Sequence, residues 1–324
     1  MLLTSLGDRF HAPSQVLEEY TATVPDYVPK LLVRDDARCA MITEFLGGYE
    51  LMRTALAHGN GTSSAAVDVA SFMARTHART HAIGKKPGHW DSWAHLTNEP
   101  MCGITAEFVF SKPLDASDPT NNCPAGLEEA AAALRNDAAA CTAVAALKHM
   151  FLTRKECLVH GDLHTGSVMV PTAGASGHAK VIDAEFAHFG CAAFDVGTFF
   201  ANLFFAWVAC EAAEARAHIV GMMAAMWGSY RDQMKAAQPS PLATPESEAD
   251  LLSLSAGMAG CELIRRVVGA AHVADLESIT DPVRKLRAEK VALAAGRALV
   301  TSYQTLTGFD ALLDCAMAAE KSVT

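Results

Sequence analysis

The segment at residues 157–195 constrains the fold of this chain most strongly, because it combines two acidic clusters with a predicted β-hairpin. Its sequence is CLVHGDLHTGSVMVPTAGASGHAKVIDAEFAHFGCAAFD. Apolar runs at 167–170 and 179–182 flank a turn rich in Gly, Ser and Pro, which is typical of two paired strands. The clusters HGD at 160–162 and DAE at 183–185 lie on either side of this hairpin. We therefore expect one rigid ribbon to hold two carboxylate sites.

The first cluster presents one carboxylate from a loop. Asp162 follows the apolar triplet 157–159, and two nearby glycines let the backbone turn tightly. A carboxylate in this position can accept a proton from an attacking hydroxyl group or orient that group. Asp162 could also do no more than cap the loop, and an isolated HGD sequence favours that simpler interpretation. The second cluster on the same ribbon shifts the preference to the catalytic role.

The second cluster has the side chains of a magnesium site. Asp183 and Glu185 are two residues apart at the end of a predicted strand, so their side chains should point to one face if the strand continues. Two hard oxygen ligands suit Mg²⁺, which completes its shell with phosphate oxygens and water. A solvated strand end is the alternative. Because the apolar Val181 and Ile182 precede the pair, we favour metal binding.

Composition excludes several classes of protein, although 51% apolar residues in a chain of 324 are enough for a large core and two domains. The net charge of −10 argues against a nucleic-acid-binding protein, which normally has a basic face. The apolar stretch 196–210 is too short to cross a bilayer, and Asp8 interrupts any signal peptide. Nine cysteines without a CxxC pair are typical of a reducing cytosol. We therefore expect a cytoplasmic globular protein without a nucleic-acid or membrane partner.

The hydrophobic pattern predicts an α+β protein with a small β-containing head, up to about residue 60, and a large helical lobe. Two short strands at 30–33 and 39–45 should form a hairpin in the head, and Pro13 should interrupt any helix that begins before it. Thr244-Pro245 and Asp281-Pro282 are typical helix starts. The predicted helices cover residues 64–82, 127–151, 196–216, 217–237, 246–276, 283–303 and 310–320.

Several motifs together resemble a known group of enzymes. HGDLH, followed by a strand, a turn and D-x-E, resembles the catalytic segment of the aminoglycoside phosphotransferase and choline kinase group, which are relatives of protein kinases. The longer strings HGDLHTGSVMV and VIDAEFAHFGCAAFDVG closely resemble the S-methyl-5-thioribose kinase family of methionine salvage. GCELIRRVVGAAHVADLESI resembles the double-arginine helix of that family, and VPDYVPKLLVRDD and ITEFL resemble its N-terminal lobe near the hinge. The resemblance covers residues 24–306.

This resemblance implies a protein-kinase-like fold, with a partial β-containing N-terminal lobe at 1–60 and a mainly helical catalytic lobe at 61–324. It also implies ATP-dependent phosphorylation of a small sugar, S-methyl-5-thioribose, to its 1-phosphate, with ATP and Mg²⁺ as cofactors. Asp162 would be the catalytic base and contact the sugar. Asp183 and Glu185 would hold Mg²⁺ against the phosphates of ATP.

The resemblance gives further residues a role at the cofactor. Ser167 stands where protein kinases have an asparagine that binds the second metal, so it is assigned to the cofactor. Asp195 should fix the catalytic loop by accepting hydrogen bonds rather than touch the substrate. The hinge, whose backbone would meet adenine, consists of Glu44, Phe45 and Leu46.

Arg265 and Arg266 are the predicted sugar-binding pair. They fall at the two edges of an apolar helix stripe, so periodicity does not show which of them faces the cleft. A solvated helix face is the simpler interpretation, but the resemblance implies contact with sugar hydroxyls or with the charge of the transferred phosphoryl group.

Other residues with reactive or aromatic side chains receive structural roles. His164, His188 and His272 lack metal-ligand spacing and should be ordinary hydrogen-bonded histidines. Trp90 and Trp93 could line the methylthio group of the sugar, but we prefer a role in anchoring their loop.

The N-terminal region departs from the kinase pattern. A kinase of this group has a glycine-rich loop over the phosphates, a strand lysine and a helix glutamate that pairs with this lysine. Here only two predicted strands precede the hinge, no lysine precedes Lys30, and Glu18 or Glu19 could be the helix glutamate. We therefore expect the polypeptide as written to be an N-terminally shortened kinase with weak or no activity and poor solubility.

Two alternatives remain open at this point. The acceptor could be another small hydroxyl compound, such as choline, homoserine or an aminoglycoside, or the chain could be a non-catalytic remnant that binds a ligand or a partner. Related kinases also suggest a homodimer.

Overall fold

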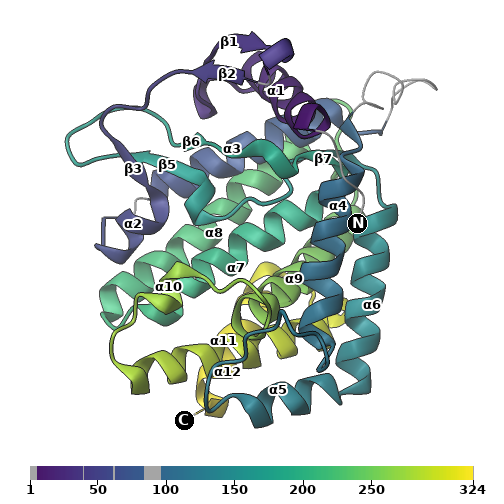
Figure 1. Cartoon of the computed structure of the whole chain (residues 1–324), viewed down its shortest axis with the longest axis vertical. Helices are drawn as coiled ribbons and strands as arrows, with labels where there is room; N and C mark the ends of the chain where they lie inside the picture. Colours follow the sequence, from purple (N-terminus) through teal and green to yellow (C-terminus); the bar gives the residue numbers. More distant parts are fainter. Residues whose placement is uncertain (1–5, 39, 61–62, 84–95, 324) are drawn as a thin grey trace. The chain divides into compact units, whose positions relative to one another are not determined.

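The computed structural model contains both helices and small β-sheets, as predicted, and helices predominate (Figure 1). It describes residues 6–38, 40–60, 63–83 and 96–323, without the side chains of 6–14 and 36. The contacts divide the chain into two units. Unit 1 comprises Met1–Cys102, Lys155–Asp195 and Met222–Ala243, and unit 2 comprises Gly103–Arg154, Val196–Gly221 and Thr244–Thr324. The lobe boundary near residue 60 stays a prediction.

The strands of unit 1 form three small antiparallel sheets. The predicted hairpin of the head is confirmed as β1 (Leu31–Asp35) paired with β2 (Ala40–Thr43). The predicted hairpin of the ribbon is confirmed as β5 (Val168–Pro171) paired with β6 (Lys180–Val181). The remaining strands are β3 (Tyr49–Leu51), β4 (Cys157–Val159) and β7 (His188–Gly190).

Strand β3 pairs with β5 and extends the ribbon to the sheet order β3-β5-β6, while β4 pairs with β7. The sequence did not predict β3, because three residues beside the Gly47-Gly48 pair carry little periodic signal. Strand β4 directly precedes the first acidic cluster, and β7 follows the second cluster. Their pairing therefore brings the two clusters close to one framework. Both predicted carboxylate sites thus lie on one framework within unit 1.

Three helices accompany these sheets: α1 (Leu6–Thr23), α2 (Met52–Ala57) and α3 (Ser63–Thr80). The predicted interruption at Pro13 is wrong, because α1 runs through this residue. Val16, Leu17 and Tyr20 are buried, so tertiary packing of the second half of the helix offsets the hydrogen bond that proline cannot donate. Helix α3 confirms the helix predicted at 64–82.

The predicted helices of the C-terminal part are confirmed, with two corrections. The single helix predicted at 246–276 is wrong, because α9 (Pro245–Val268) ends before a separate α10 (Ala274–Glu277). The single helix predicted at 127–151 is wrong, because the chain forms α5 (Glu128–Arg135) and then α6 (Ala138–Thr153). Asp137 lies between them and accepts hydrogen bonds from the backbone amides of Ala139 and Ala140, which starts a new helix. Before α5, the chain forms α4 (Glu99–Thr105), the π-helix η5 (Ala106–Ser111) and the 3₁₀ turn η6 (Lys112–Leu114).

The C-terminal part of unit 2 consists of α9 (Pro245–Val268), α10 (Ala274–Glu277), α11 (Pro282–Ser302) and α12 (Phe309–Val323). The predicted helix starts are confirmed: the Thr244 side chain accepts from the Ser247 amide, and Asp281 caps α11. Helix α11 packs against α9 and α12. A Cβ atom on Gly260 of α9 would lie 2.8 Å from the Gly296 carbonyl oxygen of α11, so glycine permits this close packing.

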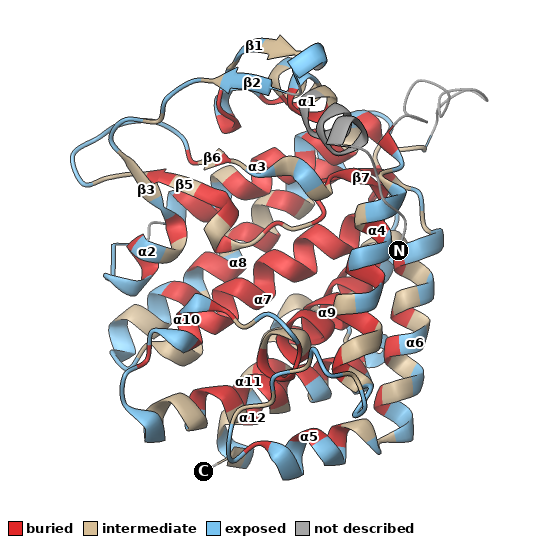
Figure 2. Cartoon of the chain, viewed as in Figure 1, coloured by how far each residue is buried: buried red, intermediate tan, exposed pale blue. Residues whose placement is uncertain are grey.

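Two further helices complete the chain, α7 (Ala192–Ala209) and α8 (Ala213–Ala236). Helix α7 is long and apolar enough to cross a membrane by length and composition alone, but 89% of it is buried (Figure 2). This burial is typical of a core helix, and α7 overlaps the helix predicted at 196–216. The eight cysteines in the described part of the chain are all free thiols.

Candidate active site

The loop that follows β4 presents Asp162. The residue before it, Gly161, has a backbone conformation that only glycine adopts easily. Gly161 has a φ of +81°, and a Cβ atom at this position would lie 2.2 Å from the carbonyl oxygen of Phe186. Such an approach is far inside van der Waals contact, so no other residue fits. The Asp162 side chain is part-exposed at the surface of unit 1. The sequence had suggested this role for the glycines of the loop, and the geometry confirms it for Gly161.

Asp195, in the first turn of α7, fixes the backbone of this loop through hydrogen bonds. Its two carboxylate oxygens accept hydrogen bonds from the backbone amides of His160 (2.7 Å) and Gly161 (2.9 Å). Asp195 is fully buried. The prediction that it fixes the loop by accepting hydrogen bonds is therefore confirmed. Two amides immediately before Asp162 are thereby held in place.

Asp195 also contacts a histidine and, through it, a tyrosine that the sequence did not reveal. His77 Nε2 lies 3.3 Å from an Asp195 oxygen, and His77 Nδ1 lies 3.0 Å from the hydroxyl of Tyr230. Burial raises the pKa of the Asp195 carboxyl, but the hydrogen bond and charge of His77, together with His160, lower it below 3.8. His77 falls on the apolar stripe of α3, so its spacing looks like that of a core residue.

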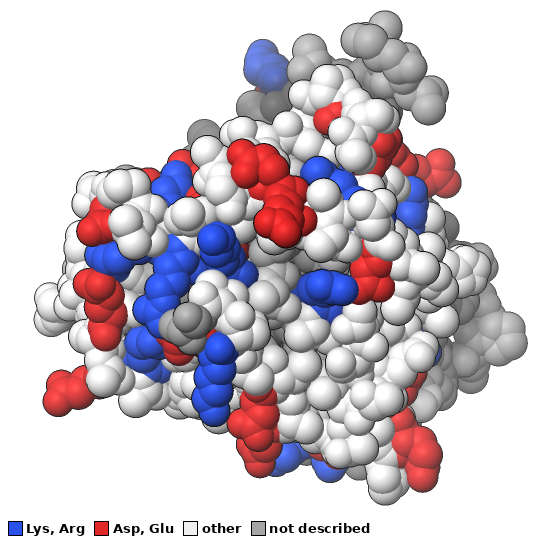
Figure 3. Space-filling view, turned by 90° about the horizontal axis from the view of Figure 1, so that it is seen from below, with Lys and Arg blue, Asp and Glu red and all other residues white. Residues whose placement is uncertain are grey.

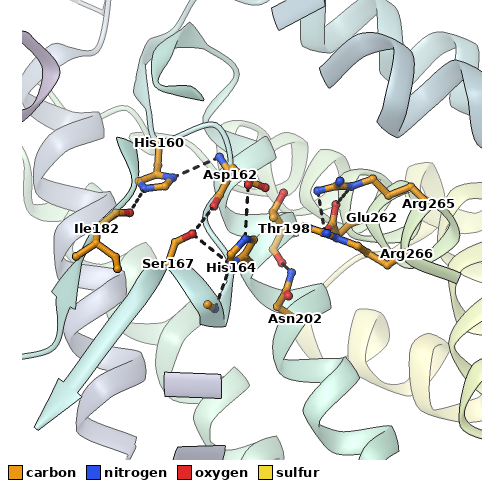
Figure 4. A network of polar contacts seen from close by, with 11 residues as sticks. His160, Asp162, His164, Ser167, Ile182, Thr198, Asn202, Glu262, Arg265 and Arg266 are labelled. Atoms are coloured by element: carbon orange, nitrogen blue, oxygen red, sulfur yellow. Dashed lines mark hydrogen bonds and ion pairs between the residues drawn. The ribbon is translucent and has the colours of Figure 1, made fainter. Parts of the chain in front are cut away.

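The side chains beside Asp162 form a local network (Figure 4). The Ser167 hydroxyl donates to the Asp162 carbonyl oxygen at 3.2 Å and lies 3.2 Å from His164 Nδ1. His164 Nε2 lies 3.5 Å from a carboxylate oxygen of Asp162, and His164 Nδ1 accepts from the Gly166 amide. His164 is therefore hydrogen-bonded, as predicted. Ser167 is buried and supports the loop, while its predicted contact with the cofactor stays a prediction.

The second acidic cluster does not continue a strand. Strand β6 ends at Val181, Asp183 has left-handed backbone angles (φ 66°, ψ 50°), and Ala184–Phe186 form a 3₁₀ turn. The condition under which Asp183 and Glu185 would share one face of a strand is therefore not met, because the strand alternation stops before them. Both side chains are exposed.

A cavity of about 320 Å³ lies at this turn, and its lining includes Asp183 and Glu185. The cavity is otherwise mostly apolar, with contributions from α1, β2 and β6. Its remaining lining residues are Leu17, Tyr20, Pro29, Met41, Thr43, Val181, Ile182 and Ala184. A small apolar cavity with a few polar groups at its edge is typical of a ligand site.

The donors at this cavity fit a magnesium ion. Within the described residues no group of three or more His, Cys, Asp or Glu side chains could hold a metal ion on its own. Mg²⁺ commonly binds through one or two protein carboxylates plus phosphate oxygens and water, so Asp183 and Glu185 supply a suitable donor set.

The predicted hinge directly follows β2. Met41 and Thr43 of this strand line the same cavity. The Glu44 amide donates to the Lys30 carbonyl oxygen at 2.8 Å, which ties the start of the hinge to the chain before β1. Phe45 is 93% exposed, and the Leu46 carbonyl oxygen accepts from the Tyr49 amide at 3.3 Å. Contact of residues 44–46 with adenine stays a prediction.

The two glutamates of α1 pair with arginines. Glu18 lies 2.8 Å from Arg34 of β1, and Glu19 lies 3.2 Å from Arg79 of α3. Both ion pairs join α1 to its neighbours in unit 1. The role of a helix glutamate that pairs with a strand lysine stays untested.

In unit 2, the predicted arginine pair converges on a glutamate. Arg266 Nε donates to Glu262 Oε1 at 2.9 Å, Arg265 Nη2 donates to the same oxygen at 3.2 Å, and Arg265 Nε donates to the other oxygen (Figure 4). Burial raises the pKa of the Glu262 carboxyl, but the charges of the two arginines outweigh it and lower the pKa to about 2. Glu262 was not among the residues predicted from the sequence, although its spacing of three and four residues from the arginines was a usable signal.

The remaining predicted residues are structural or lie outside the described part. His188 Nδ1 lies 2.9 Å from the Phe186 carbonyl oxygen, and burial lowers the pKa of His188 to about 4. His272 contacts Glu277 at 3.1 Å and the carbonyl oxygen of Asn122 at 2.6 Å. Both are hydrogen-bonded, as predicted. Trp90 and Trp93 lie outside the described residues.

Comparison with known proteins gives a family for this arrangement. Residues 7–232 match the model of the phosphotransferase enzyme family. A methylthioribose kinase from Cronobacter sakazakii (strain ATCC BAA-894) is 35% identical over 314 residues, which cover 90% of this chain and 76% of the relative. A methylthioribose kinase from Bacillus pumilus (strain SAFR-032) is 32% identical over 309 residues, which cover 92% of this chain and 77% of the relative.

Solved structures support the kinase-like fold. A glucosamine kinase (crystal form A) superposes with a TM-score of 0.55 at 18% identity and covers 87% of this chain and 69% of that chain. The same kind of kinase, in complex with glucosamine, ADP and inorganic phosphate, gives a TM-score of 0.53 at 17% identity. The motifs that resembled the kinase group are thus matched along most of the sequence and in the fold. This chain belongs to the phosphotransferase enzyme family and, within it, to the methylthioribose kinases.

Proposed function

We propose that this protein transfers the γ-phosphoryl group of ATP to the anomeric hydroxyl of S-methyl-5-thioribose and forms the 1-phosphate, a reaction of methionine salvage. The observation that carries the proposal is the likeness to methylthioribose kinases over nine-tenths of the chain, at 35% identity for one of them. The loop geometry supports a kinase mechanism, because a part-exposed carboxylate is held on a fixed backbone.

Asp162 is the proposed base. It orients the anomeric hydroxyl group and accepts its proton as the hydroxyl oxygen attacks phosphorus. Because Asp195 holds the amides of His160 and Gly161, the Asp162 carboxylate needs little reorganisation during the reaction. Fixed geometry matters in phosphoryl transfer, where positioning and charge stabilisation supply most of the catalysis.

Asp183 and Glu185 are the proposed ligands of Mg²⁺, which, when bound, neutralises charge on the phosphates of ATP. The cavity beside them is proposed to receive the nucleotide, with the backbone of Glu44, Phe45 and Leu46 at the adenine and Ser167 near the phosphates.

Arg265 and Arg266 are the proposed sugar ligands, because guanidinium groups donate several hydrogen bonds in a fixed geometry. We also propose a cytoplasmic location, since scattered free cysteines are typical of a reducing compartment, and a homodimer, which the kinase resemblance implies.

The test is transfer of labelled γ-phosphate from ATP to methylthioribose by the protein and by its Asp162→Asn variant. Removal of a general base typically lowers the rate by about 10²–10⁴-fold, so we expect a loss of that size. Asp232→Asn, which changes an exposed aspartate of α8, is the matched control and should keep the wild-type rate.

Choline, homoserine and an aminoglycoside serve as competing acceptors in the same assay. No transfer to methylthioribose above the level of Asp162→Asn, or faster transfer to a competing acceptor, would refute the proposal.

A further inference from the structure

Three charged side chains on neighbouring turns of α9 form a compact group, which we call the α9 charge cluster: Glu262, Arg265 and Arg266. Both guanidinium groups donate to the carboxylate of Glu262, and one of its oxygens accepts from both arginines (Figure 4). The Glu262 side chain is only 1% exposed, and the two arginine side chains are each 12% exposed. Solvent therefore screens these charges less than it screens charges on an open surface.

The cluster has a net charge of +1 at neutral pH. Its arginines are always protonated. Glu262 is ionised, because its two arginine partners outweigh the effect of burial and bring its pKa to about 2. Two positive charges and one negative charge thus lie within hydrogen-bonding distance of one another on one helix.

Glu262 has two physical consequences for the arginines. Its carboxylate fixes the direction in which both side chains extend, which is what hydrogen bonding to a neutral sugar requires. It also cancels half of their charge, and charge is what determines the attraction for a phosphate dianion. Two arginines without this carboxylate would make a stronger phosphate site than sugar site.

We infer that Glu262 is a specificity-determining residue, which makes the arginine pair favour the neutral sugar over phosphorylated ligands and so eases release of the phosphorylated product. This inference rests on the proposed function, in which Arg265 and Arg266 contact the sugar. Glu262 acts through the arginines and is a positioning residue rather than a catalytic one.

The experiment varies the net charge of the cluster and measures the Kd of inorganic phosphate by calorimetry, with neither ATP nor sugar present. Glu262→Gln raises the net charge to +2, and we expect phosphate to bind roughly tenfold more tightly. Arg265→Gln lowers the net charge to zero and should weaken phosphate binding. The double variant Glu262→Gln/Arg265→Gln returns the net charge to +1 and should bind phosphate approximately as the wild type does.

The sugar provides the opposite readout. The KM for methylthioribose should rise in Glu262→Gln, because the arginines lose their fixed direction, while inorganic phosphate becomes a stronger competitive inhibitor. A purely structural defect would weaken both ligands together. Glu289→Gln, the same change at a buried glutamate of α11, is the matched control and should change neither value.

Glu262→Gln leaves two part-buried arginines without their carboxylate, a change that is strongly destabilising. Its folding is therefore checked first. If it is unfolded, the double variant, with its compensated charge, and Arg265→Gln carry the test, after circular dichroism has shown that they are folded. If phosphate affinity does not follow the net charge across the folded variants, or if sugar and phosphate affinity fall together, the inference is wrong.

Failure of the proposed function gives a different result. The wild type would then transfer no phosphate to methylthioribose, whatever the calorimetry shows. If the wild type phosphorylates methylthioribose but phosphate affinity does not change with the cluster charge across the variants, the inference is wrong and the proposed function stands.

Discussion

Two buried carboxylates do similar work in this protein, each within its own unit. Asp195 binds the backbone amides that precede Asp162, and Glu262 binds the side chains of Arg265 and Arg266. Each is ionised because hydrogen-bond donors and positive charges outweigh the cost of burial. In both cases a residue that need not touch a ligand orients the residues predicted to do so.

Gly161→Ala tests the loop geometry. The added methyl group would meet the Phe186 carbonyl oxygen at 2.2 Å, so the loop must shift and kinase activity should fall by at least about tenfold, as a small misplacement of a catalytic group does. Gly174→Ala is the matched control, because Gly174 also has a positive φ but nothing lies within 4 Å of its added Cβ. Both variants have the cost of a left-handed alanine, about 1–2 kcal/mol. Equal activity in the two variants would contradict the prediction.

Asp195→Asn tests the buried carboxylate. Breaking such a pairing costs about 3 kcal/mol or more, so the free energy of unfolding from urea titration should fall by this amount at pH 7. The pKa of Asp195 is lowered in the folded state, so its stabilising contribution is present above pH 3.8 and is lost as the pH falls through the folded-state pKa. The difference between wild type and variant should therefore shrink below pH 3.8. A difference that is independent of pH would show that Asp195 stabilises the fold without its charge.

At the scale of elements, one helix ends and the next begins where a polar side chain can accept hydrogen bonds from the first amides of the new helix. The alanine-rich segment at 127–151 has helix-forming residues on both sides of its break, so propensity alone predicts one helix. Asp137 caps α6 and also accepts hydrogen bonds from Arg297 of α11 at 2.8 and 2.6 Å. The contact with α11 makes the break favourable.

Asp137→Ala should destabilise the protein by about 1–2 kcal/mol, because the first amides of α6 lose their acceptor. The midpoint of thermal unfolding measures this loss. Asp137→Asn is the informative control, since asparagine is also a good N-cap but lacks the charge that pairs with Arg297. If Asn is as destabilising as Ala, the ion pair rather than the cap accounts for the effect.

At the scale of the whole molecule, the surface carries charges of both signs and several exposed apolar side chains. On the face that Figure 3 shows, Lys and Arg side chains lie among Asp and Glu side chains. The β1–β2 hairpin of unit 1 exposes neighbouring apolar side chains, and the cross-strand partners Val33 and Ile42 are 51% and 57% exposed. A two-stranded sheet with exposed apolar residues and open edges favours association between molecules.

Replacing both residues by threonine, Val33→Thr/Ile42→Thr, keeps two β-branched side chains but removes the apolar surface. We expect the concentration at which light scattering detects aggregates to rise by about twofold or more, with little change in unfolding free energy. Val283→Thr, which changes a single exposed valine of α11, should leave aggregation unchanged. An equal effect of the control would show that general surface polarity is responsible.

The particular elements show where prediction from sequence succeeded. The HGD loop, the two hairpins and the caps at Thr244 and Asp281 were predicted because each depends on residues a few positions apart. The left-handed turn at Asp183, directly after the predicted strand, was not foreseen, because alternation of apolar and polar residues carries no signal for it. Glu262 was missed although it lies only three and four residues from its partners.

The sequence by itself thus determined the fold class, the kinase family and the acidic clusters, because short-range chemistry encodes turns, caps and motifs. Only the tertiary structure decided what holds the site. His77 and Asp195 are 118 positions apart, and His77 and Tyr230 are 153 positions apart. Their contacts arise because burial brings distant parts of the chain together, and buried polar groups need hydrogen-bond partners there. A periodic pattern records that such residues are inside, but not which residues meet there.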